Sequence, residues 1–148
     1  MSERLKQLYQ EMILEHNKRP RNFKKVEPCS HESHGVNPLC GDDYYVFVDI
    51  ENDKIKDIGF LGKGCAISKS SGSLMTESIK GKTITEVIAL KNDFINLLTN
   101  DQSASTNLGK LKVFEGVKEF PARVKCAALV WRALEDAIET QAGEITTE

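Results

Sequence analysis

The sequence has no long hydrophobic run and no large excess of charge of either sign. No apolar stretch approaches the roughly 20 residues that a membrane-spanning helix requires, and residues 1–6 do not resemble the apolar core of a secretory signal. The 20 basic and 22 acidic residues leave a net charge of −2, whereas nucleic-acid binding favours a basic face. We therefore expect a soluble, cytoplasmic protein with no membrane or nucleic-acid partner.

Histidine is scarce, and several catalytic motifs are missing. Three histidines provide little material for a histidine-based triad, and no Gly-x-Ser-x-Gly elbow is present. The segment Gly62-Lys63-Gly64-Cys65 lacks the spacing of a nucleotide-binding phosphate loop. No C-x₂-C pair of the zinc-finger kind occurs either. The remaining candidates for chemistry are the four cysteines, Cys29, Cys40, Cys65 and Cys126.

The hydrophobic pattern predicts helices at both ends of the chain, with strands near the start. Apolar residues recur at helical spacing in residues 3–17, 83–98 and 122–140, and the last of these segments follows Pro121. Residues 65–79 contain few helix-breaking residues and are also predicted to be helical. Thr83-Ile84-Thr85-Glu86 matches a capping box. Residues 44–50 and 55–61 are predicted to form a hairpin, and an earlier strand can lie within the irregular residues 18–39. This order predicts an α+β domain with helices on one face of a small antiparallel sheet.

Two segments are expected to be poorly packed. Residues 99–120 are polar and are typical of a mobile or loosely packed connector. The chain beyond Gly143 is expected to fray. At 148 residues the whole chain corresponds to one domain, since domains usually have about 100–200 residues.

Three cysteines lie at points where the predicted structure changes. Cys40 precedes a strand, Cys65 opens a helix in a glycine-flanked loop, and Cys126 lies in the first turns of the last helix. A helix N-terminus favours thiolate, the form that binds metal and attacks sulfur. Asp42 can add an oxygen ligand, so Cys40, Asp42, Cys65 and Cys126 together match the donor types of tetrahedral Zn²⁺.

Spacing alone leaves other interpretations open. Free cysteines often simply fill a hydrophobic core, and an even number of cysteines can form disulfides, although that is typical of secreted chains. Cys29, His31 and His34 form a second possible zinc set. Against this second set, His31-Glu32-Ser33-His34 is polar and is expected in an exposed loop.

Three ordered segments resemble the signatures of the U-type iron–sulfur assembly proteins, which include the IscU scaffolds and their SufU relatives. The segments are Asn37-Pro38-Leu39-Cys40-Gly41-Asp42, Gly62-Lys63-Gly64-Cys65-Ala66-Ile67-Ser68 and Arg123-Val124-Lys125-Cys126-Ala127. The resemblance covers nearly the whole chain. It implies a single U-type domain over residues 1–148, with a three-stranded antiparallel sheet and helices on one face.

The resemblance also implies a function in sulfur transfer. Cys40, Asp42, Cys65 and Cys126 are similar to the family's zinc ligands. Cys40 is then the acceptor of persulfide sulfur from a pyridoxal-phosphate-dependent, SufS-like cysteine desulfurase, and it is freed from zinc when a desulfurase histidine replaces it. The sulfur passes on to downstream SUF assembly proteins, and no independent turnover is expected. Arg123 is expected to support the thiolates.

Three features resemble the SufU branch. Lys125 stands where the IscU scaffolds carry histidine, residues 99–120 look like the SufU insertion, and Phe120-Pro121-Ala122-Arg123-Val124-Lys125 replaces the chaperone-recruiting Leu-Pro-Pro-Val-Lys. Two alternatives stay open. One is a scaffold that builds a transient iron–sulfur cluster on the three thiolates, and the other is a structural zinc domain. Cys29 matches no motif position.

Overall fold

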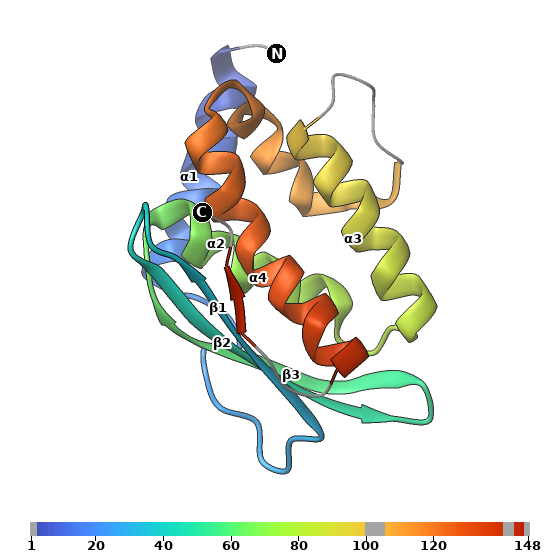
Figure 1. Cartoon of the computed structure of the whole chain (residues 1–148). Helices are drawn as coiled ribbons and strands as arrows, with labels where there is room; N and C mark the ends of the chain where they lie inside the picture. Colours follow the sequence, from blue (N-terminus) through green and yellow to red (C-terminus); the bar gives the residue numbers. More distant parts are fainter. Residues whose placement is uncertain (1–2, 100–105, 141–143, 147–148) are drawn as a thin grey trace.

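The structure is a computed structural model that describes residues 3–99, 106–140 and 144–146 (Figure 1). Its elements are α1 (Glu3–Lys18), β1 (His31–Asn37), β2 (Asp42–Glu51), β3 (Lys54–Lys63), α2 (Ala66–Ile79), α3 (Ile84–Thr99), the 3₁₀ segment η1 (Thr106–Glu119), α4 (Pro121–Thr140) and β4 (Glu144–Thr146). The α-helices lie on one face of the sheet, as the α+β prediction required. Among the helices that these residues form, none combines enough length with enough apolar character to span a membrane.

The predicted three-stranded antiparallel sheet is present and has one additional strand. β1 pairs with β2, and β2 pairs with β3, both antiparallel. β4 pairs in parallel with β1, so the order is β3-β2-β1-β4. The expectation of fraying is therefore wrong for residues 144–146. Without β4, β1 would be an edge strand with unpaired backbone groups, and β4 pairs with them. The expected earlier strand is β1, and it contains His31 and His34 instead of leaving them in an exposed loop.

The predicted capping box is confirmed at the start of α3. The backbone N–H of Thr83 donates to Oε1 of Glu86 at 3.0 Å, and the backbone N–H of Glu86 donates to Oγ1 of Thr83 at 3.2 Å. These reciprocal bonds satisfy two donors that a helix start leaves unpaired.

The described part of the expected loose connector is packed into the core. Residues 106–119 form 3₁₀ turns with a kink at Gly109, while residues 100–105 lie outside the described residues. Five apolar side chains of this segment are buried. One is Val113, and the other four recur at intervals of three residues: Leu108, Leu111, Phe114 and Val117. A 3₁₀ helix has three residues per turn, so Leu111, Phe114 and Val117, which follow the kink, share one face. The expectation of loose packing over 99–120 is wrong for this part of the chain.

A glycine allows α4 to lie directly on β1. A Cβ at Gly35 would lie 3.1 Å from Cδ1 of Leu129 and 3.3 Å from Cβ of Ala133. Gly35 and Asn37 face the same side of a strand, and Leu129 and Cys126 are three residues apart on one helix face. The contact at Gly35 therefore places Cys126 over Asn37, whose Nδ2 lies 3.9 Å from Cys126 Sγ.

A buried serine joins α2 to α4. Ser71 Oγ donates to the carbonyl of Ala127 at 2.7 Å and accepts from Nε1 of Trp131 at 3.2 Å. Because small side chains let two helices approach closely, this bond fixes the start of α2 relative to the cysteine-bearing part of α4. The two helices and the β1–β2 turn thus meet at one end of the sheet (Figure 1).

Candidate metal centre

Cys40 lies on the turn that joins β1 to β2. Its backbone N–H donates to the carbonyl of Asn37 at 3.2 Å, and Gly41 follows at φ +73°, a conformation that glycine adopts without strain. The neighbouring Leu39 is 74% exposed, whereas Asp42 is only 1% exposed. Cys40 itself is half-buried. The turn therefore presents a cysteine at the surface beside a carboxylate that points inward.

Cys65 caps the N-terminus of α2. It has an extended backbone, and its sulfur accepts a hydrogen bond from the backbone N–H of Ser68 at 3.5 Å. Its own backbone N–H donates to Oδ1 of Asp42 at 3.1 Å. The unpaired N–H groups at a helix start favour a negative charge on this sulfur.

Cys126 is the fully buried cysteine of the set. Its side chain is 0% exposed. Burial raises the pKa of the Cys126 thiol above its ordinary value, and hydrogen bonding to Cys40 and Asp42 and the negative charge of Cys65 raise it further. The thiol therefore stays protonated at neutral pH until a metal cation binds to its sulfur.

Three of the four predicted ligands converge. Sγ of Cys40, a carboxylate oxygen of Asp42 and Sγ of Cys126 all lie within 4.8 Å of one another, and this is the one such group among the described residues. The sulfur of Cys65 lies outside that group, although its backbone N–H contacts Asp42. The structure thus brings Cys40, Asp42 and Cys126 together and places Cys65 next to them.

Two buried polar atoms show that the group fits a cation. Oδ2 of Asp42 and Oδ1 of Asn37 are buried, with no hydrogen-bond partner among the described residues. Leaving such an atom unpaired costs about 1–3 kcal/mol, more for a charged carboxylate. A cation that prefers sulfur with some oxygen would satisfy Asp42 and lower the pKa of Cys126.

Arg123 lies at the solvent side of this group. The negative charge of Cys65, followed by the hydrogen bond to Cys126, raises the pKa of the exposed Arg123 guanidinium. This fixed positive charge thus lies beside Cys65 and Cys126, two of the three predicted sulfur ligands. Lys125, two residues later, is also exposed.

The comparison with known proteins agrees with this geometry. A family model described as the NifU-like N-terminal domain matches residues 8–140. The chain belongs to this family. The resemblance to U-type iron–sulfur assembly proteins is therefore confirmed.

Its relatives carry both names that the signature segments suggested. The zinc-dependent sulfurtransferase SufU of Bacillus subtilis is 38% identical over 137 residues, which are 92% of each chain. The iron–sulfur cluster assembly scaffold protein IscU of Streptococcus pyogenes is 36% identical over 140 residues, 94% of this chain and 87% of that one. A Fervidobacterium islandicum structure, described as a scaffold protein for the SUF system, matches with a TM-score of 0.84 and 34% identity, over 90% of this chain and 98% of that one.

The alternative zinc set is not assembled in this NifU-like domain. Sγ of Cys29 donates to the carbonyl of His31 at 2.8 Å. Nε2 of His34 lies 2.6 Å from Oδ1 of Asp43, and its ring stacks on Tyr45 with centroids 4.2 Å apart. Over the described ranges, these three side chains do not form a group with metal-ligand spacing.

Three residues near the group were given no role by the sequence. Asn37 approaches Cys126, Ser68 donates to Oδ1 of Asp42 at 3.0 Å, and the hydroxyl of Tyr44 lies 3.0 Å from Oγ of Ser68. Burial raises the pKa of the Tyr44 phenol, which therefore keeps its proton. Asn37 and Ser68 lie within the signature segments, which was the available signal. Tyr44 looked like an ordinary strand residue.

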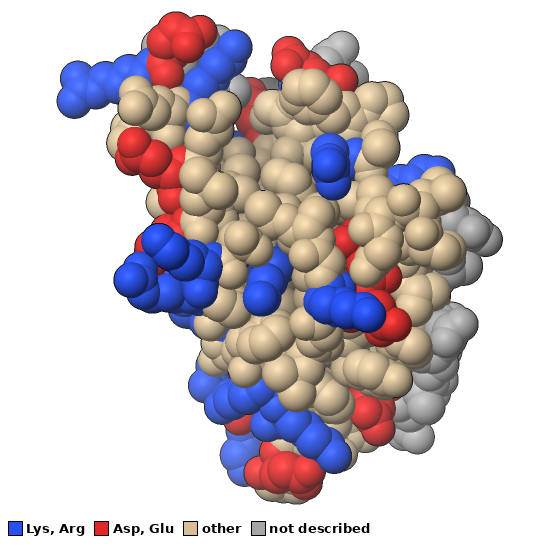
Figure 2. Space-filling model, turned by 90° about the vertical axis from the view of Figure 1, so that its left-hand side faces the viewer, with Lys and Arg blue, Asp and Glu red and all other residues tan. Residues whose placement is uncertain are grey.

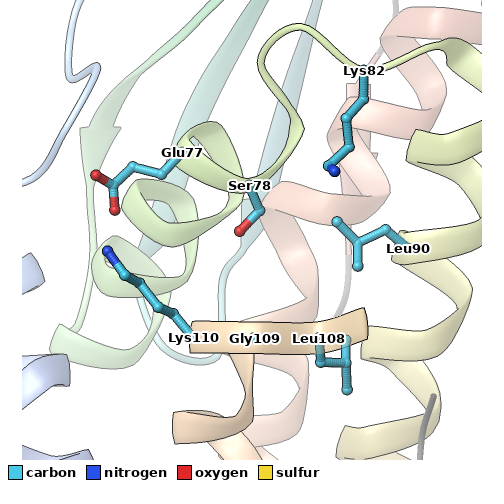
Figure 3. A pocket seen from close by; sticks show the side chains of 7 residues that line it. All are labelled: Glu77, Ser78, Lys82, Leu90, Leu108, Gly109 and Lys110. Carbon is cyan, nitrogen blue, oxygen red and sulfur yellow. The ribbon is translucent and has the colours of Figure 1, made fainter. Parts of the chain in front are cut away.

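A cavity of about 330 Å³ lies at the opposite end of α2 from Cys65 (Figure 3). It is lined by Glu77, Ser78, Lys82, Leu90, Leu108, Gly109 and Lys110. These residues include no sulfur or imidazole donor. The cavity is therefore not an alternative centre for a sulfur-preferring metal in this NifU-like domain.

Proposed function

We propose that this chain is a zinc-containing sulfur acceptor in iron–sulfur cluster assembly, which takes persulfide sulfur from a cysteine desulfurase and passes it on. The observation that carries the proposal is the convergence of Cys40, Asp42 and Cys126 within 4.8 Å, with a cysteine at the surface and a buried carboxylate oxygen unpaired. The B. subtilis relative, a zinc-dependent sulfurtransferase by name, supports it.

The residues have separate roles in this proposal. Cys40, Asp42, Cys65 and Cys126 would hold zinc, which when bound keeps the thiolates deprotonated and stabilises the fold around them. Cys40 is the acceptor, because it is half-buried on a turn beside the exposed Leu39. Cys126 is fully buried, and the sulfur of the half-buried Cys65 already accepts a hydrogen bond from the backbone N–H of Ser68 at the start of α2. Arg123 keeps a positive charge beside the thiols of Cys65 and Cys126.

The sulfur transfer is a thiol exchange that needs no outside oxidant or reductant. The Cys40 thiolate attacks the outer sulfur of the desulfurase persulfide, and a new S–S bond forms on Cys40. The S–S bond of the donor breaks, and the donor cysteine leaves as a thiolate. The desulfurase is a pyridoxal-phosphate enzyme of the SufS-like kind, and downstream SUF assembly proteins receive the sulfur.

The surface around the turn suits docking of another protein. The left-hand side of Figure 1, where α1 lies, faces the viewer in Figure 2. On this face, groups of basic and acidic residues border areas without charged residues. Leu39, beside Cys40, and Phe120, before α4, are 74% and 60% exposed. Exposed apolar side chains next to a reactive thiol provide contact area for a partner that must reach it.

A second candidate function is a scaffold on which an iron–sulfur cluster is built. The IscU relative at 36% identity favours it, and Cys40, Cys65 and Cys126 are its ligands. A carboxylate among three thiolates would make the cluster easier to release than an all-cysteine site.

Metal analysis of the protein, isolated anaerobically from its own cells, separates the two functions. About one zinc per chain, without acid-labile sulfide, supports the sulfur acceptor, whereas iron with matching sulfide supports the scaffold. Sulfide release by the partner desulfurase then tests the thiol. Cys40→Ala should abolish stimulation and Cys29→Ala should keep it, because Cys29 bonds to the backbone of β1. Full stimulation by Cys40→Ala overturns the proposal.

A further inference from the structure

The two oxygens of the Asp42 carboxylate are in different environments. Oδ1 accepts hydrogen bonds from the backbone N–H of Cys65 at 3.1 Å and from Oγ of Ser68 at 3.0 Å. Oδ2 is buried and has no partner among the described residues. The surrounding protein therefore occupies one oxygen and leaves the other available.

Ser68 is itself held in place by Tyr44. The tyrosine hydroxyl lies 3.0 Å from Oγ of Ser68, and both side chains are 0% exposed. Ser68 has one hydroxyl proton, and the carboxylate is its strongest nearby acceptor. The tyrosine O–H therefore donates to Ser68, and Ser68 donates to Asp42. This gives a buried chain, Tyr44 to Ser68 to Asp42.

Gly64 supplies the space in which this chain fits. A Cβ at Gly64 would lie 2.5 Å from Oδ1 of Asp42, 2.5 Å from Oγ of Ser68 and 2.7 Å from the hydroxyl of Tyr44. All three linked atoms thus converge where a methyl group would stand. The absence of a side chain at position 64 is a requirement of the hydrogen-bonded chain.

We infer that Tyr44 and Ser68 are positioning residues that, with Gly64, make Asp42 a one-oxygen ligand through Oδ2. The inference rests on the proposed metal site and specifies how its oxygen ligand is set. With Oδ1 occupied by two donors, Asp42 supplies one oxygen beside three sulfurs, which suits a four-coordinate zinc. Without those donors both oxygens are free to bind, and the carboxylate loses its fixed orientation.

The test uses Ser68→Ala, Tyr44→Phe and Gly64→Ala, none of which changes a proposed ligand. The matched control for Ser68→Ala is Ser70→Ala, a buried serine of α2 whose hydroxyl donates to the carbonyl of Ile67. The other controls are the outward-facing Tyr45→Phe and Gly116→Ala, where a Cβ would meet no atom of the described residues within 4 Å. Zinc affinity is measured by competition with a chromophoric chelator. The optical spectrum of the Co²⁺-substituted protein reports the sulfur ligands and the coordination number.

We expect Ser68→Ala and Gly64→Ala to bind zinc about 10–100-fold more weakly, the usual cost of losing an outer-shell partner, and Tyr44→Phe to have a smaller effect in the same direction. Sulfur-to-cobalt charge transfer should persist, while the d–d bands change with the coordination of the carboxylate. Thermal unfolding of the metal-free proteins shows whether a variant still folds. If one fails to fold, the other two carry the test.

The outcomes separate this inference from the proposed function. Wild-type protein that binds neither Zn²⁺ nor Co²⁺ through sulfur contradicts the metal site itself. A second outcome overturns only the positioning role. In it the wild type binds metal, the zinc affinities of Ser68→Ala and Gly64→Ala lie within about twofold of those of their controls, and the d–d bands are unchanged. An equal loss of affinity in the control variants also overturns it, because the effect would then be general to buried substitutions.

Discussion

Gly35→Ala tests whether the contact between β1 and α4 sets the position of Cys126. The new methyl would meet Cδ1 of Leu129 at 3.1 Å, which can move by rotation, and Cβ of Ala133 at 3.3 Å, which moves only if α4 shifts. Overpacking of a core typically costs about 1–3 kcal/mol, and the restricted unfolded chain returns about 0.4–1 kcal/mol. A net loss of roughly 0.5–2 kcal/mol corresponds to a Tm lower by about 1–8 °C for a domain of this size.

Differential scanning calorimetry of Gly35→Ala, Ala133→Gly and the double variant measures the contact. Ala133→Gly alone loses helix propensity, about 1 kcal/mol, but it removes the Cβ that the new methyl would meet. The double variant should therefore be more stable than the sum of the single effects predicts, by about 0.5 kcal/mol or more. Gly35→Ala should also weaken metal binding, because Cys126 lies one turn before Leu129 on α4. Strict additivity together with unchanged metal affinity would refute the reasoning.

Three further predictions concern stability. Phe114→Ala should lower the free energy of unfolding in urea by about 3–5 kcal/mol, because Phe114 is 0% exposed and meets Phe94 edge-on at 5.6 Å. Phe120→Ala, at 60% exposure, is the control. Equally small effects of the two substitutions would contradict the packing of η1. Burial lowers the pKa of His16 below 6.5, so the unfolded chain binds more protons and stability should fall as the pH drops below 6.5. Unfolding at several pH values should show this fall in the wild type and a smaller one in His16→Gln, and equal slopes would count against it. Glu135→Gln should lower the free energy of unfolding by about 1 kcal/mol in the same assay, because it leaves Lys91, 3.1 Å from both carboxylate oxygens, without its charge partner. The double variant Lys91→Met with Glu135→Leu should recover the lost stability. A double variant as unstable as Glu135→Gln would contradict the pairing.

Local sequence signals predicted the elements whose formation depends on near neighbours. The capping box of Thr83 and Glu86 formed as expected, since its bonds connect residues three apart. The hairpin of β2 and β3 formed because two segments rich in β-branched and aromatic residues flank a polar turn. Strand β1 was less visible, because its inward side chains are Ser33, Gly35 and Asn37, which lack the usual apolar alternation.

The segment after α3 shows how a period can be overlooked. Leu108, Leu111, Phe114 and Val117 recur every three residues in a mostly polar stretch, and a period of three is neither the α-helical nor the strand period. The polar composition favoured a loose connector. The tertiary structure decided otherwise, because Phe114 packs edge-on against Phe94, which in turn stacks on Trp131.

The sequence by itself determined the family and supplied the candidate ligands, because the signature segments place three cysteines and Asp42 at fixed points of the fold. It did not determine which of those atoms meet. Contact between Gly35 and Leu129 sets the depth of Cys126, and the bonds of Cys65 and Ser68 to Oδ1 decide which oxygen of Asp42 stays free. These contacts join residues from 23 to 94 positions apart, so only the packing of α2, α4 and the β1–β2 turn against one another creates them.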